Sequence, residues 1–339
     1  MESSNNKFGR KVVIRSMVNN RALPKNLELV DIELFQNALK ITIPEVDIWE
    51  LKVVTIIKNS LFIHQLWHFK FSLSHILQFS KFKVWRKLYL LPFLKTTIDR
   101  ACWVIDEWSC EYFHWLTDAL PRLQVIEQYI GKFPVLLPTN YKSNSYVLES
   151  LEILGVEYIF YNPSAPLKIN ELFSSSHVAP TGNYNKQILL ALKRRMVRNI
   201  YVGAEKKIYI SRAKSSKRKL INEEEVVTLF SRFGIEVHCF EDYSLDEQID
   251  LMAQTKYLIG LHGAGLTNMI FMNPHGKVLE IRNRGDRHNN AFFALASELD
   301  INYYYQLSES NKSNTQLDDF SVDVTDLEKL LVRFLSQDD

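Results

Sequence analysis

A glycine-rich turn late in the chain has the composition of an anion-binding site. Residues 257–281 read as a strand, a turn, a short helix, a second turn and a second strand. Gly263 and Gly265 let the backbone of the first turn approach a ligand more closely than residues with a Cβ atom would. The helix that follows begins with N–H groups that have no partner inside the helix, at the positive end of its dipole. We therefore expect a phosphate group to be held by His262, Gly263, Ala264, Gly265, Leu266, Thr267 and Asn268.

The strand after this turn carries a carboxylate. Glu280 lies within the apolar run Val278–Ile281, where a carboxylate has to pair or accept hydrogen bonds. Ribose hydroxyls are a natural partner for a carboxylate at this place in a nucleotide-binding sheet. The turn and Glu280 together predict a site for a nucleoside diphosphate. The alternative is that the glycines only allow tight packing where a strand passes into a helix.

Two arginines are expected at the same edge of the sheet. The strand Lys207–Ser211 runs directly into Arg212, and Arg218 follows in a basic loop. Because the carboxyl ends of parallel strands meet at one edge, both arginines are placed to neutralise a pyrophosphate. The alternative is a run of solvated charges.

A histidine and an aspartate in the first half of the chain are spaced for proton transfer. If residues 112–119 form a helix, His114 and Asp118 lie one turn apart on the same face. An imidazole oriented by a carboxylate is a plausible general base, and Asp118 could itself be the base. The alternative is a packed helix in which the two side chains satisfy each other.

Several motifs of other enzyme classes are missing from the sequence. There is no Asp-x-Asp, the usual carboxylate pair for a metal-bound sugar nucleotide, and the cysteines have no metal-binding spacing. The P-loop, the nucleophile elbow of hydrolases and the third glycine of a dinucleotide fingerprint are also absent. The sequence therefore argues against a P-loop kinase, an α/β hydrolase and a dehydrogenase, and it predicts neither a metal nor a cofactor.

The composition is that of an ordinary globular protein. The 339 residues are enough for two domains, and 46% of them are apolar and 24% charged. A net charge of +2 argues against a nucleic-acid-binding protein. The cysteines read as free thiols in a reducing compartment, and the polar start of the chain lacks the apolar core of a signal peptide. We expect a cytoplasmic protein.

Residues 51–98 are basic and aromatic. They contain no acidic residue, and Lys and Arg alternate there with many aromatic residues. Such a stretch could seat the protein on an anionic membrane surface, or face an acidic carbohydrate or a pyrophosphate-linked lipid. The alternative is an ordinary α/β region with solvated charges and aromatic residues in its core.

Strand and helix patterns alternate along the chain, most clearly after residue 206. This alternation predicts a parallel, doubly wound sheet. We expect a first domain at residues 1–200, a second domain at 201–322 and a C-terminal helix at 323–339.

Three segments together resemble glycosyltransferase family 61. They are residues 112–123, residues 208–212 with Arg218 and Asn222–Glu223 downstream, and residues 260–268 with 278–281. Their order and spacing resemble the family over roughly the last two-thirds of the chain. The first hundred residues show no usable match.

The resemblance implies an α/β fold of the GT-B type, with two Rossmann-like domains facing each other across a cleft. It also implies an inverting, metal-independent transfer of a sugar from a nucleotide diphosphate donor, expected to be a UDP-sugar, to a glycan or glycolipid acceptor. Arg212, Arg218, residues 262–268 and Glu280 would hold the donor. His114 and Asp118 would lie across the cleft near the acceptor hydroxyl.

Within the family, the chain is more similar to the short bacterial members. Those are associated with capsule, lipopolysaccharide or lipooligosaccharide assembly on the cytoplasmic face of the membrane, which agrees with an anionic membrane contact through residues 58–95. The rival hypothesis is a nucleotide-sugar-binding or scaffold protein of a polysaccharide assembly complex that has no turnover.

Overall fold

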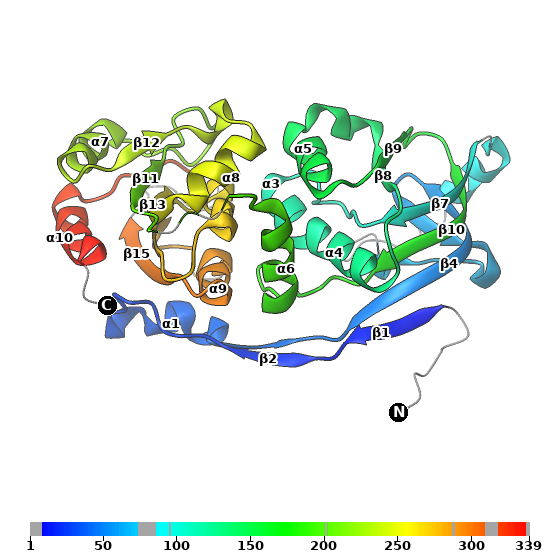
Figure 1. The fold of residues 1–339 in the computed structure, drawn as a ribbon, viewed down its shortest axis with the longest axis horizontal. Coiled ribbons are helices and arrows are strands. Elements are labelled where there is room, and N and C mark those ends of the chain that lie inside the picture. The colour runs from blue at the N-terminus through cyan, green and yellow to red at the C-terminus, as the bar shows by residue number, and fades with distance from the viewer. Residues whose placement is uncertain are drawn as a thin grey trace. The chain divides into compact units, whose positions relative to one another are not determined.

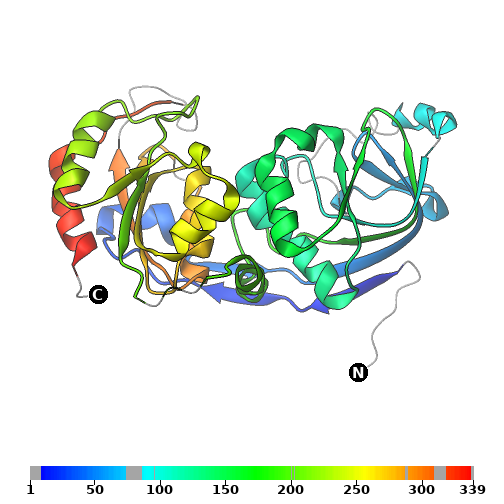
Figure 2. The ribbon, with the colours of Figure 1, turned by 45° about the horizontal axis from the view of Figure 1, so that its top comes forward.

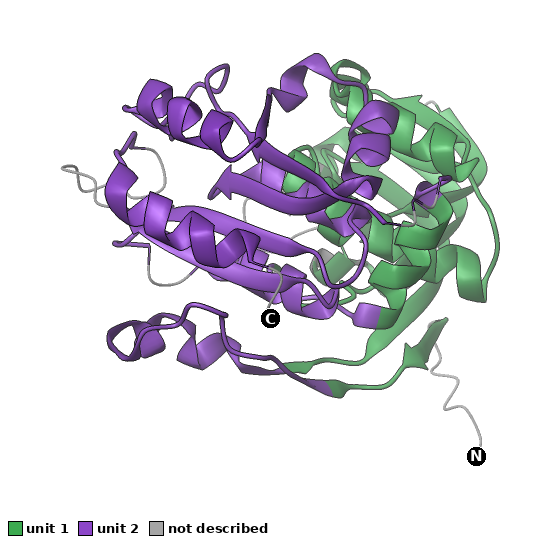
Figure 3. Cartoon of the chain, turned by 60° about the vertical axis from the view of Figure 1, so that its left-hand side comes forward, with its two compact units in different colours: residues 1–17, 42–181, 187–195 green, residues 18–41, 182–186, 196–339 purple. Residues whose placement is uncertain are grey.

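The chain folds into two compact units (Figure 3). The computed structural model describes residues 9–73, 86–94, 96–199, 201, 203–286, 289–308 and 318–336. The first unit comprises residues 1–17, 42–181 and 187–195, and the second comprises residues 18–41, 182–186 and 196–339.

The second unit is built on a five-stranded sheet in the order β12-β11-β13-β14-β15 (Figure 1). All four pairings between neighbouring strands are parallel. This is the parallel sheet that the alternation of strands and helices predicts. The strands are β11 (Lys206–Ile210), β12 (Glu236–His238), β13 (Thr255–Leu261), β14 (Lys277–Asn283) and β15 (Asn302–Ser308).

Helices cover both faces of this sheet (Figures 1 and 2). Helices α7 and α10 pack on one face, and α8 and α9 lie on the other. Ser244 begins α8 with a capping box, in which its hydroxyl accepts from the N–H of Glu247 and the Glu247 carboxylate accepts from the N–H of Ser244. The helices are α7 (Glu223–Arg232), α8 (Leu245–Ala253), α9 (Ala291–Glu298), α10 (Val324–Leu335) and the 3-10 helix Ala264–Phe271.

Residues 18–41 belong to the second unit, although the sequence places them in the first domain. Phe35 is fully buried, and its ring lies 5.1 Å from that of Phe293 and 5.0 Å from that of Tyr305. Helix α10 also belongs to the core of this unit rather than standing apart, because Phe334 packs against Tyr304. Both differences arise from apolar contacts between segments far apart in the sequence. The N-terminal elements are β2 (Met17–Asn20), the 3-10 helices Leu29–Asp31 and Gln36–Ala38, α1 (Ile32–Phe35) and β3 (Lys40–Ile43).

The first unit has a mixed sheet in the order β6-β5-β4-β10-β7-β8-β9, with β1 paired to β4. Strands β10, β7, β8 and β9 are parallel, whereas β4 is antiparallel to β10, β5 and β1. Lys58 and Asn59 have φ values of 47° and 58°, as in the tight turns that join antiparallel strands. This half of the sheet therefore departs from a Rossmann-like arrangement. The strands are β1 (Arg10–Ile14), β4 (Val46–Ile57), β5 (Ser60–Ile63), β6 (His68–Phe69), β7 (Thr96–Trp103), β8 (Val135–Pro138), β9 (Tyr158–Tyr161) and β10 (Leu167–Ser175).

A continuous helical segment after β7 carries the predicted histidine and aspartate. It consists of α3 (Tyr112–His114), a π-helical turn (Trp115–Ala119) and α4 (Leu120–Tyr129). Pro121 lacks an N–H group and its ring crowds the carbonyl one turn earlier, so a wider turn before it relieves the strain. The remaining helices are α5 (Ser145–Leu154), α6 (Lys186–Met196) and the 3-10 helices His64–Leu66, Phe71–Leu73, Arg86–Phe93, Thr139–Ser143 and Phe240–Asp242.

The described residues thus form a mixed α/β protein. The facing of two Rossmann-like domains across a cleft stays a prediction. In the part of the chain that the structure describes, every helix is too short or too polar to cross a lipid bilayer.

Candidate functional site

The strand order of the second unit reverses between β11 and β13. From β11 the chain passes through α7 to β12 on one side, and then crosses to β13 on the other side of β11. In open α/β sheets, ligands bind outside the carboxyl ends of the strands at such a reversal. Arg212 follows the end of β11, and Gly263 follows the end of β13. Because Ile210 pairs with Gly260, the sheet brings these two sequence-predicted residues together.

Arg212 lies directly against Gly263. A Cβ atom on Gly263 would overlap Nη1 of Arg212 and would lie 3.1 Å from its Cζ atom. Gly263 has φ of 163°, an extended conformation that any residue can adopt, so glycine is needed there for space. At Gly265, a Cβ atom would lie only 3.0 Å from Cγ2 of Ile210. Both glycines therefore permit the close approaches that the sequence predicts.

The basic loop after β11 wraps around the guanidinium of Arg212. The Nε atom of Arg212 donates to the carbonyl of Arg218 at 3.1 Å, and Nη2 donates to the hydroxyl of Ser215 at 2.8 Å and to the carbonyl of Lys217 at 3.0 Å. Arg218 closes the loop with φ of 56°, in the left-handed region. The loop is therefore an ordered structure around Arg212, and not only a run of solvated charges.

Arg212 and Arg218 form a partly desolvated pair of positive charges. Burial lowers the pKa of both side chains, and for Arg212 the charge of Arg218 lowers the pKa further. Among the described residues, Nε of Arg218 is buried without a hydrogen-bond partner. Both guanidinium groups remain charged near neutral pH, so a bound anion would relieve their repulsion and supply the missing acceptor.

Residues 264–268 of the glycine-rich turn divide into those that a ligand can contact and those that hold the turn in shape. Ala264 and Gly265 are partly exposed, whereas Leu266, Thr267 and Asn268 are buried. Asn268 donates from Nδ2 to the carbonyl of Gly265 at 3.1 Å and so holds the turn in shape. A phosphate would therefore meet the backbone N–H groups at the start of the 3-10 helix Ala264–Phe271.

Glu280 is fully buried and its carboxylate is occupied by protein groups. Its Oε1 atom accepts from Nδ1 of His262, and its Oε2 atom accepts from the hydroxyl of Tyr303 at 2.5 Å. Burial opposes ionisation, but the interactions with His262, Arg282 and Tyr303 outweigh it and lower the pKa of Glu280. A ribose could reach Glu280 only if His262 or Tyr303 moved. In this geometry Glu280 orients His262, whose Nε2 atom accepts from Nδ2 of Asn289 at 3.0 Å.

His114 and Asp118 lie together in the first unit, as their spacing predicts. Nδ1 of His114 is 2.7 Å from Oδ2 of Asp118. The aspartate side chain is 3% exposed and the imidazole is 18% exposed. Solvent thus reaches the imidazole, and the carboxylate behind it fixes the ring and its tautomer. This arrangement can accept a proton at Nε2.

Asp106 and His177 form a second pair of this kind, which was not among the residues predicted from the sequence. Oδ2 of Asp106 lies 2.9 Å from Nε2 of His177. Asp106 follows β7 and His177 follows β10, and both strands are buried at their carboxyl ends. A carboxylate or a histidine placed just after a buried strand is the signal that could have indicated them.

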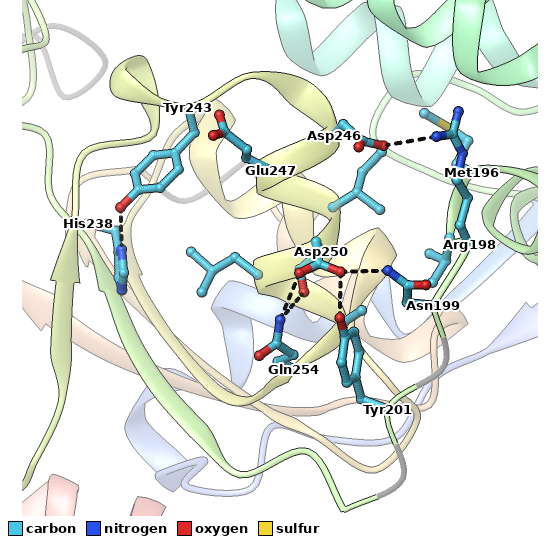
Figure 4. A pocket seen from close by; sticks show the side chains of 14 residues that line it. Met196, Arg198, Asn199, Tyr201, His238, Tyr243, Asp246, Glu247, Asp250 and Gln254 are labelled. Atoms are coloured by element: carbon cyan, nitrogen blue, oxygen red, sulfur yellow. Dashed lines mark hydrogen bonds and ion pairs between the residues drawn. The ribbon is translucent and has the colours of Figure 1, made fainter.

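A pocket of about 550 Å³ in the second unit lies apart from all the predicted site residues (Figure 4). At its centre Asp250 accepts from Nδ2 of Asn199 at 3.0 Å, from the hydroxyl of Tyr201 at 2.7 Å and from Nε2 of Gln254 at 2.9 Å. These contacts tie the segment before β11 to α8. Asp246 and Glu247 also line the pocket, and with Asp250 these carboxylates outnumber the one arginine of the lining, Arg198, so the pocket would repel a diphosphate.

Among the described residues, no cluster of three or more His, Cys, Asp or Glu side chains is placed to hold a metal ion. The groups assembled at the β11–β13 reversal are instead two arginines and the N–H groups of a helix start. Their chemistry suits an anion.

Comparison with known proteins places the chain in a family. Residues 112–279 match the family model Glycosyltransferase 61. The chain belongs to glycosyltransferase family 61. The matched range includes His114, Asp118, Arg212, Arg218 and the glycine turn, and it ends one residue before Glu280.

Two characterised relatives of this family 61 chain are plant and mammalian. A β-1,2-xylosyltransferase of Oryza sativa subsp. japonica is 29% identical over 198 residues, which are 50% of this chain and 34% of the relative. An EGF domain-specific O-linked N-acetylglucosamine transferase of Bos taurus is 28% identical over 89 residues, which are 25% of this chain and 17% of the relative. The chain therefore spans about a third or less of each relative. The expected likeness to bacterial surface-polysaccharide enzymes stays a prediction.

Proposed function

We propose that this chain is an inverting, metal-independent glycosyltransferase that moves a sugar from a nucleotide diphosphate donor, a UDP-sugar, to a glycan acceptor. The observation that carries the proposal is the joining of Arg212, Arg218 and the Gly263–Gly265 turn at the strand reversal of the second unit. Two desolvated guanidinium groups beside the N-terminus of a helix suit a diphosphate. Membership of family 61 and the names of both relatives support sugar transfer.

The proposed reaction is a single displacement. The acceptor oxygen bonds to the anomeric carbon while the bond from that carbon to the diphosphate oxygen breaks. The acceptor proton passes to Nε2 of His114, supported by Asp118, or to Asp118 itself. The leaving diphosphate takes up negative charge, which Arg212, Arg218 and the N–H groups of the turn stabilise. These groups would do the work that a metal ion does in enzymes with an Asp-x-Asp pair.

Within this proposal Glu280 acts through His262. Its two oxygen atoms are engaged by His262 and Tyr303, so it would hold the imidazole at the turn while the arginines contact the phosphates. His262 would then border the donor without being free to rotate. A direct contact between Glu280 and ribose, which the sequence predicts, would require His262 or Tyr303 to move.

The first test is a thermal-shift panel of nucleoside diphosphates and UDP-sugars, measured with and without EDTA. A ligand that binds only the folded protein raises the melting temperature by mass action. We expect a shift with UDP that survives EDTA and is lost in Arg212→Ala. Lys214→Ala is the matched control, because this exposed lysine pairs with Asp242 on the surface. No shift with any nucleotide would contradict the proposal, and a shift that EDTA removes would contradict metal independence.

The rival candidate is a nucleotide-sugar-binding or scaffold protein without turnover. It would show the same thermal shift, yet substitutions of His114 and Asp118 would not change its function. Detection of sugar transfer by the wild-type protein, lost in His114→Ala, decides between the two candidates.

We also propose that the protein acts in the cytoplasm at an anionic membrane, in capsule, lipopolysaccharide or lipooligosaccharide assembly. Part of the basic stretch at 58–95 lies outside the described residues. In its described part, Trp67, Tyr89 and Phe93 are 63%, 62% and 61% exposed, whereas Phe62 and Phe69 are core residues. Exposed aromatic side chains in a stretch of sequence that is rich in Lys and Arg suit an anionic membrane surface.

Vesicle sedimentation tests this contact. We expect binding to vesicles that contain phosphatidylglycerol and none to vesicles of phosphatidylcholine alone. Trp67→Ser should weaken the binding, and Val332→Ser, at an equally exposed apolar position of the second unit, should leave it unchanged. Equal binding to both kinds of vesicle, or to neither, would contradict the contact.

A further inference from the structure

The parallel half of the first unit's sheet has a strand reversal of its own. Strands β7, β8 and β9 follow one another in space, and the chain then returns to place β10 on the other side of β7. Trp103 pairs with Ser174, so the segments that leave β7 and β10 emerge side by side. Asp106 and His177 each lie three positions after these paired residues. They therefore meet at the place where an α/β sheet binds its ligand.

Asp106 is held as an ionised carboxylate. Its Oδ1 atom accepts from the N–H of Trp108 at 2.9 Å, and from the N–H and hydroxyl of Ser109 at 3.1 Å and 3.0 Å. Burial opposes ionisation, but the hydrogen bond from His177, the charge of Arg122 and the N–H of Trp108 hold the pKa of Asp106 at about 2. Such a carboxylate is a poor base, but it can hold a hydrogen-bond donor in a fixed position.

His177 is anchored by this carboxylate and still reaches solvent. Its side chain is 21% exposed, whereas the side chain of Asp106 is fully buried. Because the ionised carboxylate can only accept, Nε2 of His177 carries the hydrogen that joins them. In the neutral ring Nδ1 is then an acceptor, ready for a hydrogen bond from a hydroxyl group.

The two His–Asp pairs belong to one cluster. The ring centroids of Trp108 and His114 are 5.0 Å apart, and the backbone of Trp108 bonds to Asp106. The fully buried guanidinium of Arg122 donates to the carbonyls of Val104 and Ser175 at 2.9 Å each, and its charge acts on both aspartates. An imidazole that can accept a hydrogen bond, in the same cluster as an indole ring, matches the hydroxyl groups and apolar face of a sugar ring.

We infer that His177, oriented by Asp106, binds a hydroxyl group of the saccharide acceptor next to the hydroxyl that reacts. The inference rests on the proposed function, since it assigns the acceptor to the site of His114. His177 contacts the substrate, and Asp106 is a positioning residue that acts through the imidazole. Proton removal remains with the His114–Asp118 pair.

The decisive variant is His177→Gln. A glutamine can donate to Asp106 as Nε2 of the imidazole does, and it places no acceptor at the position of Nδ1. A merely structural histidine would tolerate this change. His177→Ala removes both bonds, and Asp106→Asn keeps a side-chain oxygen for the backbone donors while favouring the wrong imidazole tautomer.

Binding is measured first, by saturation-transfer NMR with methyl pyranosides of xylose, glucose, galactose and N-acetylglucosamine. We expect the wild-type protein to bind at least one of them, and His177→Gln to bind it about tenfold more weakly, the loss of about one hydrogen bond. The melting temperature of His177→Gln should stay that of the wild type. Asp106→Asn should weaken binding to the same extent. Binding by His177→Gln within twofold of the wild type, or no binding of any probe by the wild type, overturns the inference.

Transfer kinetics then separate this inference from the proposed function. With the donor found by thermal shift and the pyranoside as acceptor, His177→Gln should raise the acceptor KM about tenfold and leave kcat and the donor KM within about twofold. A fall of kcat by about a hundredfold with an unchanged acceptor KM would make His177 the base and overturn its assignment as a binding residue. If the wild type binds the pyranoside through His177 but transfers no sugar, saccharide binding by His177 stands, and the proposed function fails together with the placing of a reacting hydroxyl beside it.

Discussion

The guanidinium of Arg212 fills the space that a side chain on Gly263 would occupy. The two residues lie 51 positions apart in the sequence and follow neighbouring parallel strands. Since φ at Gly263 is 163°, an alanine there would be blocked by Arg212 alone and not by the backbone. This contact links the turn that would bind phosphate to the arginine that would neutralise it.

Gly263→Ala should therefore weaken nucleotide binding by displacing Arg212. We expect UDP affinity, measured by isothermal titration calorimetry, to fall about tenfold to a hundredfold, the range for one charged hydrogen bond. In an Arg212→Ala background the same glycine substitution should cause almost no further loss of UDP affinity. Additive losses in this double-mutant cycle would show that the glycine acts independently of Arg212.

Removal of either arginine should slow transfer. Arg212→Ala and Arg218→Ala each withdraw a preorganised positive donor from the leaving diphosphate, which should raise the barrier by about 2–4 kcal/mol. Steady-state kcat should fall by about two to three orders of magnitude at saturating donor. Lys214→Ala serves as the control for loss of a nearby positive charge, since its side chain is 52% exposed. Wild-type turnover in both arginine variants would remove them from the mechanism.

Substitutions of His114 and Asp118 should identify the base. Both Asp118→Asn and His114→Gln should lower kcat by about 10²–10⁴ if the imidazole takes the proton. If Asp118 is the base, His114→Gln should retain most of the activity. UDP affinity should not change, because these residues belong to the first unit and the arginines to the second. Glu152→Gln, at an exposed carboxylate on α5, is the control, and equal activity in all three variants would refute both assignments.

Asp106 should make stability depend on pH in the acid range. The pKa of its carboxyl group falls from 3.8 to about 2 on folding, so ionised Asp106 stabilises the native state by about 2 kcal/mol. A depressed pKa means that this contribution is complete above about pH 5, is roughly half lost by pH 3 and vanishes below pH 2. Urea unfolding of wild type and Asp106→Asn should show a difference in unfolding free energy that shrinks between pH 5 and pH 3. A difference that stays constant over this range would contradict the native pKa.

Much of the second unit could be predicted from local sequence. The parallel sheet follows from apolar runs that alternate with helical patterns, and the start of α8 follows from Ser244 and Glu247 three positions later. The pairing of His114 with Asp118 follows from one turn of helix. Each of these features depends on residues within a few positions of one another, so a periodic pattern is sufficient to indicate it.

Other features depend on the register between strands and could not be predicted in this way. Glu280 meets His262 and Tyr303 because β14 lies between β13 and β15, so both oxygen atoms of this carboxylate have protein partners. Phe35 joins the second unit although it lies near the start of the chain. Local sequence patterns do not indicate such contacts, because the two partners of a buried group are far apart in the sequence and meet only in the folded core.

By itself, therefore, the sequence determined the α/β class, the glycine turn with its two arginines, and the His114–Asp118 pair. Only the tertiary structure decided that Asp106 and His177, 71 positions apart, share a hydrogen bond at the β7–β10 reversal. Helical periodicity and turn chemistry act over a few residues and leave a visible pattern. The partner of a buried carboxylate is set by which strands lie side by side, and that is a property of the whole fold.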